Sequence, residues 1–123
     1  MQWLVIALGG ALGAMGRYWV VTAVTAAAGR WIPWGTLAAN VAGSLVIGLS
    51  YVIFVERAAL SPEWRSLVMV GLLGAFTTFS SFALEAVHLL QEGAWLRAMV
   101  YLLGSVILCI LAAGLGLWAG RQW

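Results

Sequence analysis

Long apolar stretches alternate with short polar breaks along the whole chain. The breaks lie at residues 29–33, 56–63 and 91–93, where charged residues gather with glycine or proline. Each apolar stretch exceeds the roughly 20 residues that a helix needs to cross a bilayer. Because the connections are short, we expect one antiparallel bundle within a single domain, residues 1–123. The pattern predicts an all-α membrane protein with four transmembrane helices, over residues 3–28, 34–55, 64–90 and 95–118.

Two local signals support these boundaries. Ser61 and Pro62 precede the third stretch as an N-cap and as a proline at the first helical position. Every tryptophan except Trp19 lies near a predicted helix end, where the headgroup layer favours an amphipathic ring. We interpret these tryptophans as interfacial anchors.

Composition also places the chain in a membrane. Hydrophobic residues make up 64% of the sequence and charged residues only 8%, against about 25% charged residues in soluble domains. The mean hydropathy is +1.03. So little polar surface excludes a soluble enzyme, a nucleic-acid-binding protein and a disordered chain. The single cysteine, Cys109, has no partner for an intrachain disulfide.

The arginines give almost no signal for one orientation in the membrane. Four spans put both termini on one side, and that side carries Arg57, Arg65 and Arg121. The opposite side carries Arg30 and Arg97. The positive-inside rule needs an imbalance to select a direction. We therefore expect dual topology, with oppositely oriented copies pairing as an antiparallel homodimer.

Small residues recur at a spacing of four, which lets helix backbones approach closely. For any single pair we favour packing within one chain. Together, the pairs indicate that several helix faces are covered by protein, including a partner chain. The pairs are Gly9 with Gly13, Ala39 with Gly43, Ser44 with Gly48, and Gly116 with Gly120.

Polar residues at membrane depth need an explanation. Asn40 lies near the middle of the second span, where its amide needs hydrogen-bond partners. It either bonds a neighbouring helix or faces a polar pathway, and its position alone favours neither. The fourth span carries Tyr101 and Ser105 on one helix face, followed by Cys109.

Glu85 and His88 lie late in the third span. A carboxylate inside a membrane is a functional candidate, but Glu85 is also close enough to the span end to reach the interface. The two side chains have the spacing to pair with each other, and they are too few to bind a metal ion.

Segment 71–82 carries the strongest signal. On an ideal helix its hydroxyls would share an arc of about 160°, with the phenyl rings on the opposite side. So many hydroxyls weaken a helix, which predicts either a break near mid-membrane or a flexible polar helix packed on its neighbours. Free carbonyls at such a break bind small cations. The hydroxyls belong to Thr77, Thr78, Ser80 and Ser81, and the rings to Phe79 and Phe82.

These polar groups suit a small anion better than a cation. They supply hydroxyl and amide donors and the positive edges of phenyl rings, whereas a cation pathway needs carboxylates or a ring of carbonyls. Weak, multiple donors also release the ion, which buried arginines would hold. The residues alone therefore favour a pathway for a small anion.

Three motifs resemble the CrcB/Fluc family of fluoride channels, and the resemblance covers the whole chain. They are GGxxGxxxR at residues 9–17, GTLxxNxxG at 35–43 and GxxTTFSxF at 74–82. The resemblance implies a passive, fluoride-selective channel that lowers cytoplasmic fluoride and confers fluoride resistance. It implies two pores in one antiparallel homodimer, in the bacterial inner membrane, with fluoride, lipid and a second copy of the chain as partners.

The resemblance also assigns residues to the pore. Phe79 and Phe82 would meet the anion with their ring edges, and Asn40 would offer its amide. Glu85 would lie near a pore end. The remaining pore residues would be Thr77, Thr78, Ser80, Ser81, Tyr101 and Ser105.

A structural Na⁺ on the dimer axis is implied as well, bound by the backbone carbonyls of Gly74 and Thr77 from both chains. Two positions depart from the family pattern. Ala75 stands where a second glycine is common, and Ser81 replaces the commoner threonine while keeping the hydroxyl.

Two other protein classes fit the sequence less well. A four-span drug/proton antiporter needs a carboxylate deep in the membrane, usually in the first span, which here contains Arg17 and no acid. A non-transporting membrane subunit would leave Asn40 and the hydroxyls of residues 77–81 without a purpose.

Overall fold

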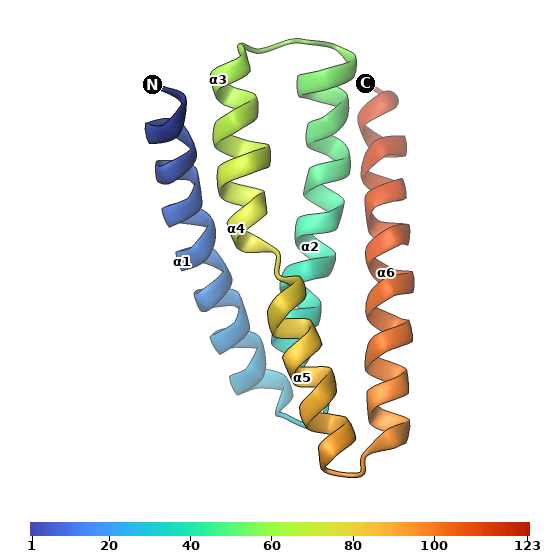
Figure 1. The fold of residues 1–123 in the computed structure, drawn as a ribbon. Helices are drawn as coiled ribbons and strands as arrows, with labels where there is room; N and C mark the ends of the chain where they lie inside the picture. Colours follow the sequence, from blue (N-terminus) through green and yellow to red (C-terminus); the bar gives the residue numbers. More distant parts are fainter.

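The computed structural model describes all residues, 1–123, and contains helices and no strands. It has four helices long and apolar enough to cross a membrane, so the prediction of an all-helical chain with four such helices is confirmed. Both termini lie at the same end of the bundle (Figure 1). The four helical spans are Gln2–Ala28, Trp34–Glu56, Pro62–Gln91 and Trp95–Arg121.

The first, second and fourth spans are continuous helices. Helix α1 covers Gln2–Ala28 and α6 covers Trp95–Arg121. Helix α2, Trp34–Tyr51, continues into a π-helical segment, η1, at Val52–Glu56. The turn that joins the third span to α6 contains Gly93 with φ 73°, a backbone conformation that glycine adopts without steric cost.

The third span consists of several segments. It begins with α3, Pro62–Arg65, where Ser61 is the N-cap residue and Pro62 starts the helix, as predicted. The π-helical segment η2, Ser66–Leu73, and the short helix α4, Gly74–Phe76, follow. Helix α5 then covers Phe79–Gln91. The junction of α4 and α5 lies about midway along the bundle (Figure 1).

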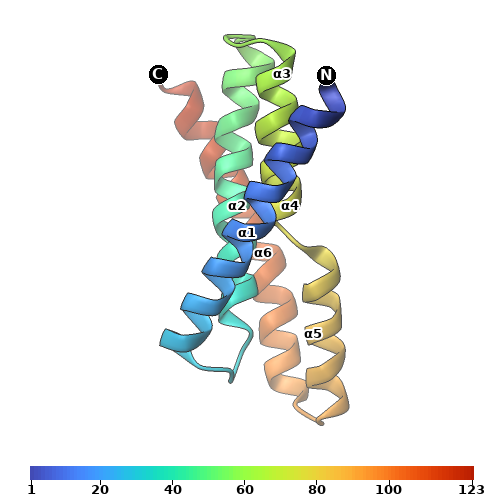
Figure 2. The same ribbon diagram turned by 90° about the vertical axis from the view of Figure 1, so that its left-hand side faces the viewer.

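Glycines set how closely the helices pack. A Cβ added to Gly9 or Gly13 of α1 would collide with the carbonyl oxygen of Leu67 or Leu72 in η2. These glycines therefore pack within one chain, as we favoured for single pairs of small residues. Beyond η2 and α4, α1 diverges from α5 (Figure 2).

The same close approach holds α2 against α6. A Cβ on Gly116 would collide with the carbonyl oxygen of Leu45, and one on Gly48 with that of Ala113. Removing side-chain bulk from both helices lets their backbones meet. The contact holds α6 beside α2, so that Ser105 of α6 lines the same cavity as Asn40 and Ser44 of α2.

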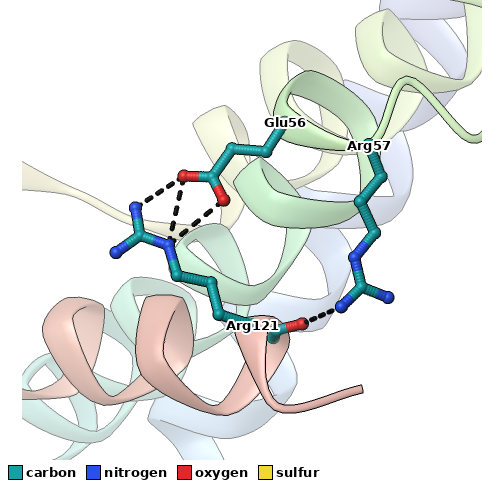
Figure 3. Close-up of polar contacts among 4 residues, drawn as sticks. Glu56, Arg57 and Arg121 are labelled. Carbon is teal, nitrogen blue, oxygen red and sulfur yellow. Dashed lines mark hydrogen bonds and ion pairs between the residues drawn. The ribbon is translucent and has the colours of Figure 1, made fainter.

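Polar contacts tie the end of α6 to the end of η1 (Figure 3). The guanidinium of Arg121 donates hydrogen bonds to the carboxylate of Glu56, with its Nε 3.1 Å from Oε2. Arg57 Nη2 donates to the carbonyl oxygen of Gly120 at 2.8 Å and also to that of Trp123. Carbonyls at a helix C-terminus lack partners within the helix, and Arg57 satisfies one of them, that of Gly120, from a neighbouring element.

Buried apolar side chains gather at the end of the bundle that contains α5. There, Tyr101 of α6 packs against Phe82 of α5, with ring centroids 5.2 Å apart. Many large apolar side chains elsewhere are exposed, as expected for faces that meet lipid or another protein. The cluster consists of Ile32, Phe82, Ala86, Leu89, Ala98 and Tyr101.

Candidate functional site

The helix of the third span is interrupted at Thr77 and Thr78. Thr77 has φ −81° and ψ 156°, and Thr78 has φ −150° and ψ 118°. These are extended conformations that do not continue the helical hydrogen-bond ladder. Two helix ends, the C-terminus of α4 and the N-terminus of α5, therefore meet about midway along the bundle (Figure 1).

Asn40 of α2 binds the interruption through both atoms of its amide group. Its Nδ2 donates to the carbonyl oxygen of Thr78 at 2.9 Å, and its Oδ1 accepts from the backbone N–H of Thr78 at 2.7 Å. Thr78 Oγ1 in turn accepts from the N–H of Ser81 at 3.1 Å and caps α5. Asn40 thus satisfies backbone groups that a continuous helix would have paired, and one of its N–H groups stays free.

Several backbone groups at the interruption stay unpaired. Because the N–H of Thr78 donates to Asn40, the carbonyl of Gly74 lacks its usual partner four residues on. The carbonyl of Thr77 also accepts no backbone hydrogen bond. The interruption therefore presents carbonyl oxygens that lack their helical partners.

A cavity of about 340 Å³, here called the phenyl cavity, lies beside the interruption. Residues of α2, α5, α6 and the interruption form its wall, and none of them is charged. Phe79 and Phe82 contribute rings whose centroids are 5.5 Å apart. Phe82 is 7% exposed and Phe79 is 78% exposed. The lining residues are Asn40, Ser44, Ile47, Thr77, Thr78, Phe79, Phe82, Ser105, Val106, Cys109 and Ile110.

Ser105 gives this cavity a hydroxyl with no partner. The residue is 5% exposed, and its Oγ is buried and makes no hydrogen bond. Buried polar atoms are almost always bonded, and the Oγ of Ser105 is the exception in this chain.

A second cavity, here called the glutamate cavity, lies where α1 diverges from α5. Its volume is also about 340 Å³. Glu85 accepts a hydrogen bond from Thr36 Oγ1 at 2.6 Å and one from the hydroxyl of Tyr101 at 3.3 Å. Glu85 therefore bonds these hydroxyls and not His88. The lining residues are Ala14, Arg17, Tyr18, Val21, Thr36, Thr78, Ser81 and Glu85.

Most of the site residues predicted from the sequence line one or the other of these two cavities. Ser81 and Glu85 line the glutamate cavity, and Thr78 lines both cavities. Tyr101 is buried behind Phe82 and reaches Glu85. Ser80 is exposed and lines neither cavity. Those that share the phenyl cavity are Asn40, Thr77, Thr78, Phe79, Phe82 and Ser105.

The ideal-helix wheel was wrong for two of the hydroxyl residues. It placed Thr77 and Thr78 opposite the phenyl rings, whereas both residues line the same cavity as Phe79 and Phe82. The reason is the extended backbone at both threonines, which ends the 100° rotation per residue on which the wheel depends. Ser81, inside α5, lines the glutamate cavity and not the phenyl cavity, whereas Thr78 lines both.

Sequence reasoning assigned neither Thr36 nor Ser44 to the candidate site. Thr36 donates to Glu85, and Ser44 lines the phenyl cavity. The signal was available, because Thr36, Asn40 and Ser44 follow one another at a spacing of four and so share a face of α2.

Comparison with known proteins identifies relatives along nearly the whole chain. A family model described as CrcB-like protein, Camphor Resistance (CrcB), matches residues 4–117. A protein of Magnetococcus marinus, named fluoride-specific ion channel FluC, is 50% identical over 121 residues, which cover 98% of each chain. A protein of Hahella chejuensis with the same name is 52% identical over 112 residues, covering 91% of this chain and 88% of the relative. The chain therefore belongs to the CrcB family.

Proposed function

We propose that this chain is a passive, fluoride-selective ion channel of the membrane, and not an enzyme. The phenyl cavity carries the proposal, because its wall combines polar donors and aromatic rings with no charged side chain. Family membership supports fluoride as the ion, since relatives about half identical to this chain are named fluoride-specific ion channels.

Fluoride entering the phenyl cavity exchanges water for weak protein donors. The hydroxyl of Ser105 has no partner in the chain, and Asn40 keeps one free N–H. The rings of Phe79 and Phe82 offer edges that carry partial positive charge. None of these groups holds a full charge, so the ion binds strongly enough to enter and weakly enough to leave.

We assign the glutamate cavity to one end of the pathway. Glu85 connects it to the phenyl cavity through Tyr101, whose ring contacts Phe82. Its wall also contains the hydroxyl of Ser81 and the guanidinium of Arg17. A carboxylate bonded to two hydroxyls suits a pore end where fluoride regains water. Ser80 is a weaker candidate for a pore residue than the other hydroxyl residues, because it lines neither cavity.

The functional unit in this proposal is an antiparallel, dual-topology homodimer with two pores. Phe79 is 78% exposed, so a single chain leaves one side of the phenyl cavity open. A second copy supplies the missing wall of the phenyl cavity. Because the pair has two-fold symmetry, the phenyl cavity of each chain is closed in the same way, which gives two pores. The balanced arginines allow both orientations in one membrane.

The interruption near the middle of the third span suits a structural Na⁺ on the dimer axis. The carbonyl oxygen of Gly74 lacks its usual helical partner, and that of Thr77 accepts no backbone hydrogen bond. Oxygen atoms are the ligands that hard cations prefer. Both chains would contribute these atoms, and the ion would hold the dimer together without being transported. Replacing Na⁺ by N-methylglucamine should lower the melting temperature of the dimer, and an unchanged value would argue against the site.

Ion flux from liposomes tests the proposed function. Purified chain in liposomes loaded with fluoride should discharge the fluoride gradient and leave a chloride gradient nearly intact. The rate should not depend on an imposed pH gradient, because a passive channel needs no proton exchange. Equal chloride flux would contradict selectivity, and obligatory coupling to protons would favour the drug/proton antiporter.

The cellular role follows from passive conduction. In the bacterial inner membrane, an open fluoride pathway lets fluoride leave the cytoplasm along its gradient, which gives fluoride resistance. Expression in a fluoride-sensitive bacterial strain should restore growth in fluoride. Expression without rescue, in cells whose membranes contain the folded chain, would contradict this role.

A further inference from the structure

A third cavity, here called the arginine cavity, lies where α1 connects to α2. Its volume is about 260 Å³. Thr25 near the end of α1, Gly29 and Arg30 in the connection, and Pro33 before α2 belong to its wall. The connection lies at one end of the bundle (Figure 2), so this cavity is close to the surface of the membrane.

The three cavities adjoin one another through shared wall residues. The phenyl and glutamate cavities share Thr78. The glutamate and arginine cavities share Val21, Thr36 and Glu85. Glu85, which accepts a hydrogen bond from Thr36, therefore lies where these last two cavities meet. The series begins at the interruption, about midway along the bundle, and ends beside Arg30.

The guanidinium of Arg30 is free to act on an ion in the arginine cavity. It forms no ion pair and no hydrogen bond within the chain, and the residue is exposed. Arg97, at the same end of the bundle, lies 3.7 Å from the carboxylate of Glu92 and donates to the carbonyl oxygen of Trp31. The charge of Arg97 is therefore offset by a neighbour, whereas that of Arg30 is not.

We propose that the arginine cavity is the mouth of the fluoride pathway and that Arg30 draws the anion into it. The inference rests on the proposed function and adds the step between the glutamate cavity and water. An ionised Glu85 repels fluoride at the boundary of the two cavities. The guanidiniums of Arg17 and Arg30, one in each cavity, offset that repulsion.

The position of Arg30 suits attraction without retention. A cation buried in a medium of low dielectric constant would bind fluoride tightly, and an ion that conducts must also leave. Because Arg30 is exposed, water and salt weaken its field, so it raises the local concentration of fluoride and lets the ion go. Its contribution should therefore depend on ionic strength.

Fluoride efflux from liposomes at two ionic strengths tests this role. At roughly 10 mM, where the field of a charge extends about 30 Å, Arg30→Gln should lower the rate per folded chain about two- to fivefold. At roughly 1 M, set with potassium isethionate, the field extends only about 3 Å, and the variant should match the wild type. Arg30→Lys keeps the charge and should match the wild type under both conditions.

Arg97→Gln is the matched control. It removes the same charge from the same end of the bundle, but Arg97 lies outside the wall of the arginine cavity and is paired with Glu92. Its efflux should equal that of the wild type at both ionic strengths.

The outcomes separate this inference from the proposed function. In a conducting chain, a wild-type rate for Arg30→Gln at low ionic strength would overturn the inference. A loss of equal size at both ionic strengths would do the same, because a structural defect does not respond to screening. An equal loss in Arg97→Gln would show that charge acts from the whole surface and not through this cavity. If the wild-type chain does not conduct fluoride, the proposed function fails and the inference fails with it.

Discussion

At the scale of single residues, Asn40 illustrates how much one side chain contributes. From the sequence its amide had two alternative roles, a helix contact or a pathway donor. In the structure it bonds both backbone groups of Thr78 and also lines the phenyl cavity. One residue therefore holds the start of α5 in place, and in the proposed function its remaining N–H group would donate to fluoride.

Replacing Asn40 by alanine should destabilise the chain. The change leaves the N–H and the carbonyl of Thr78 without partners, at a cost of about 2–4 kcal/mol, and removes a donor from the cavity. Unfolding in detergent should require less denaturant, and fluoride efflux per folded chain should fall. Ser44→Ala is the control, because Ser44 lines the same cavity without bonding Thr78. Equal stability of the two variants would contradict this role of Asn40.

At the scale of elements, the helices were easier to predict than their contacts. Four long apolar stretches fixed the number of membrane-spanning helices because hydropathy and length are local properties. The partners of the polar side chains are not local. Thr36 and Glu85 lie 49 residues apart in sequence, and Asn40 and Thr78 lie 38 apart, so only the packed bundle shows that they meet.

The backbone at Thr77 and Thr78 limited the prediction of the site in the same way. Clustered hydroxyls indicated a weak point in the third span. They did not indicate which residues would become extended, because that depends on Asn40 of another helix. The periodicity of a single helix therefore misplaced both threonines relative to the phenyl rings.

A pair of glycines on α1 tests the packing of that helix. Gly13→Ala should destabilise the chain by about 1–3 kcal/mol, because the new Cβ collides with the backbone of Leu72 in η2. A Cβ added to Gly10 would meet no neighbouring atom within 4 Å, so Gly10→Ala should be neutral or stabilise by up to about 1 kcal/mol through helix propensity. Denaturant unfolding of both variants measures the difference. A Gly13→Ala variant as stable as Gly10→Ala would show that α1 does not pack closely on η2.

At the scale of the whole molecule, the single chain is incomplete in several places. The ring of Phe79 is largely exposed, and carbonyls at the interruption lack partners. In a membrane, unpaired backbone is tolerated only inside protein or beside water. A second copy of the chain in the opposite orientation would cover these groups.

Dual topology makes a direct prediction for the C-terminus. Because the arginines are balanced, a reporter fused after Trp123 should be found on both sides of the membrane in one cell population. Adding several lysines to the connection around Leu60 should shift the reporter to one side. A reporter found on one side only in the unmodified chain would contradict the antiparallel dimer.

Fluoride efflux from liposomes that contain Phe→Ile variants measures most directly whether the phenyl cavity conducts the ion. Phe79→Ile and Phe82→Ile each remove a ring edge from the cavity, whereas Phe54→Ile makes the same exchange in η1, outside its wall. We predict a large loss of efflux for the first two variants and a wild-type rate for the third, each measured on folded protein. Wild-type efflux through both Phe79→Ile and Phe82→Ile would show that fluoride takes another route.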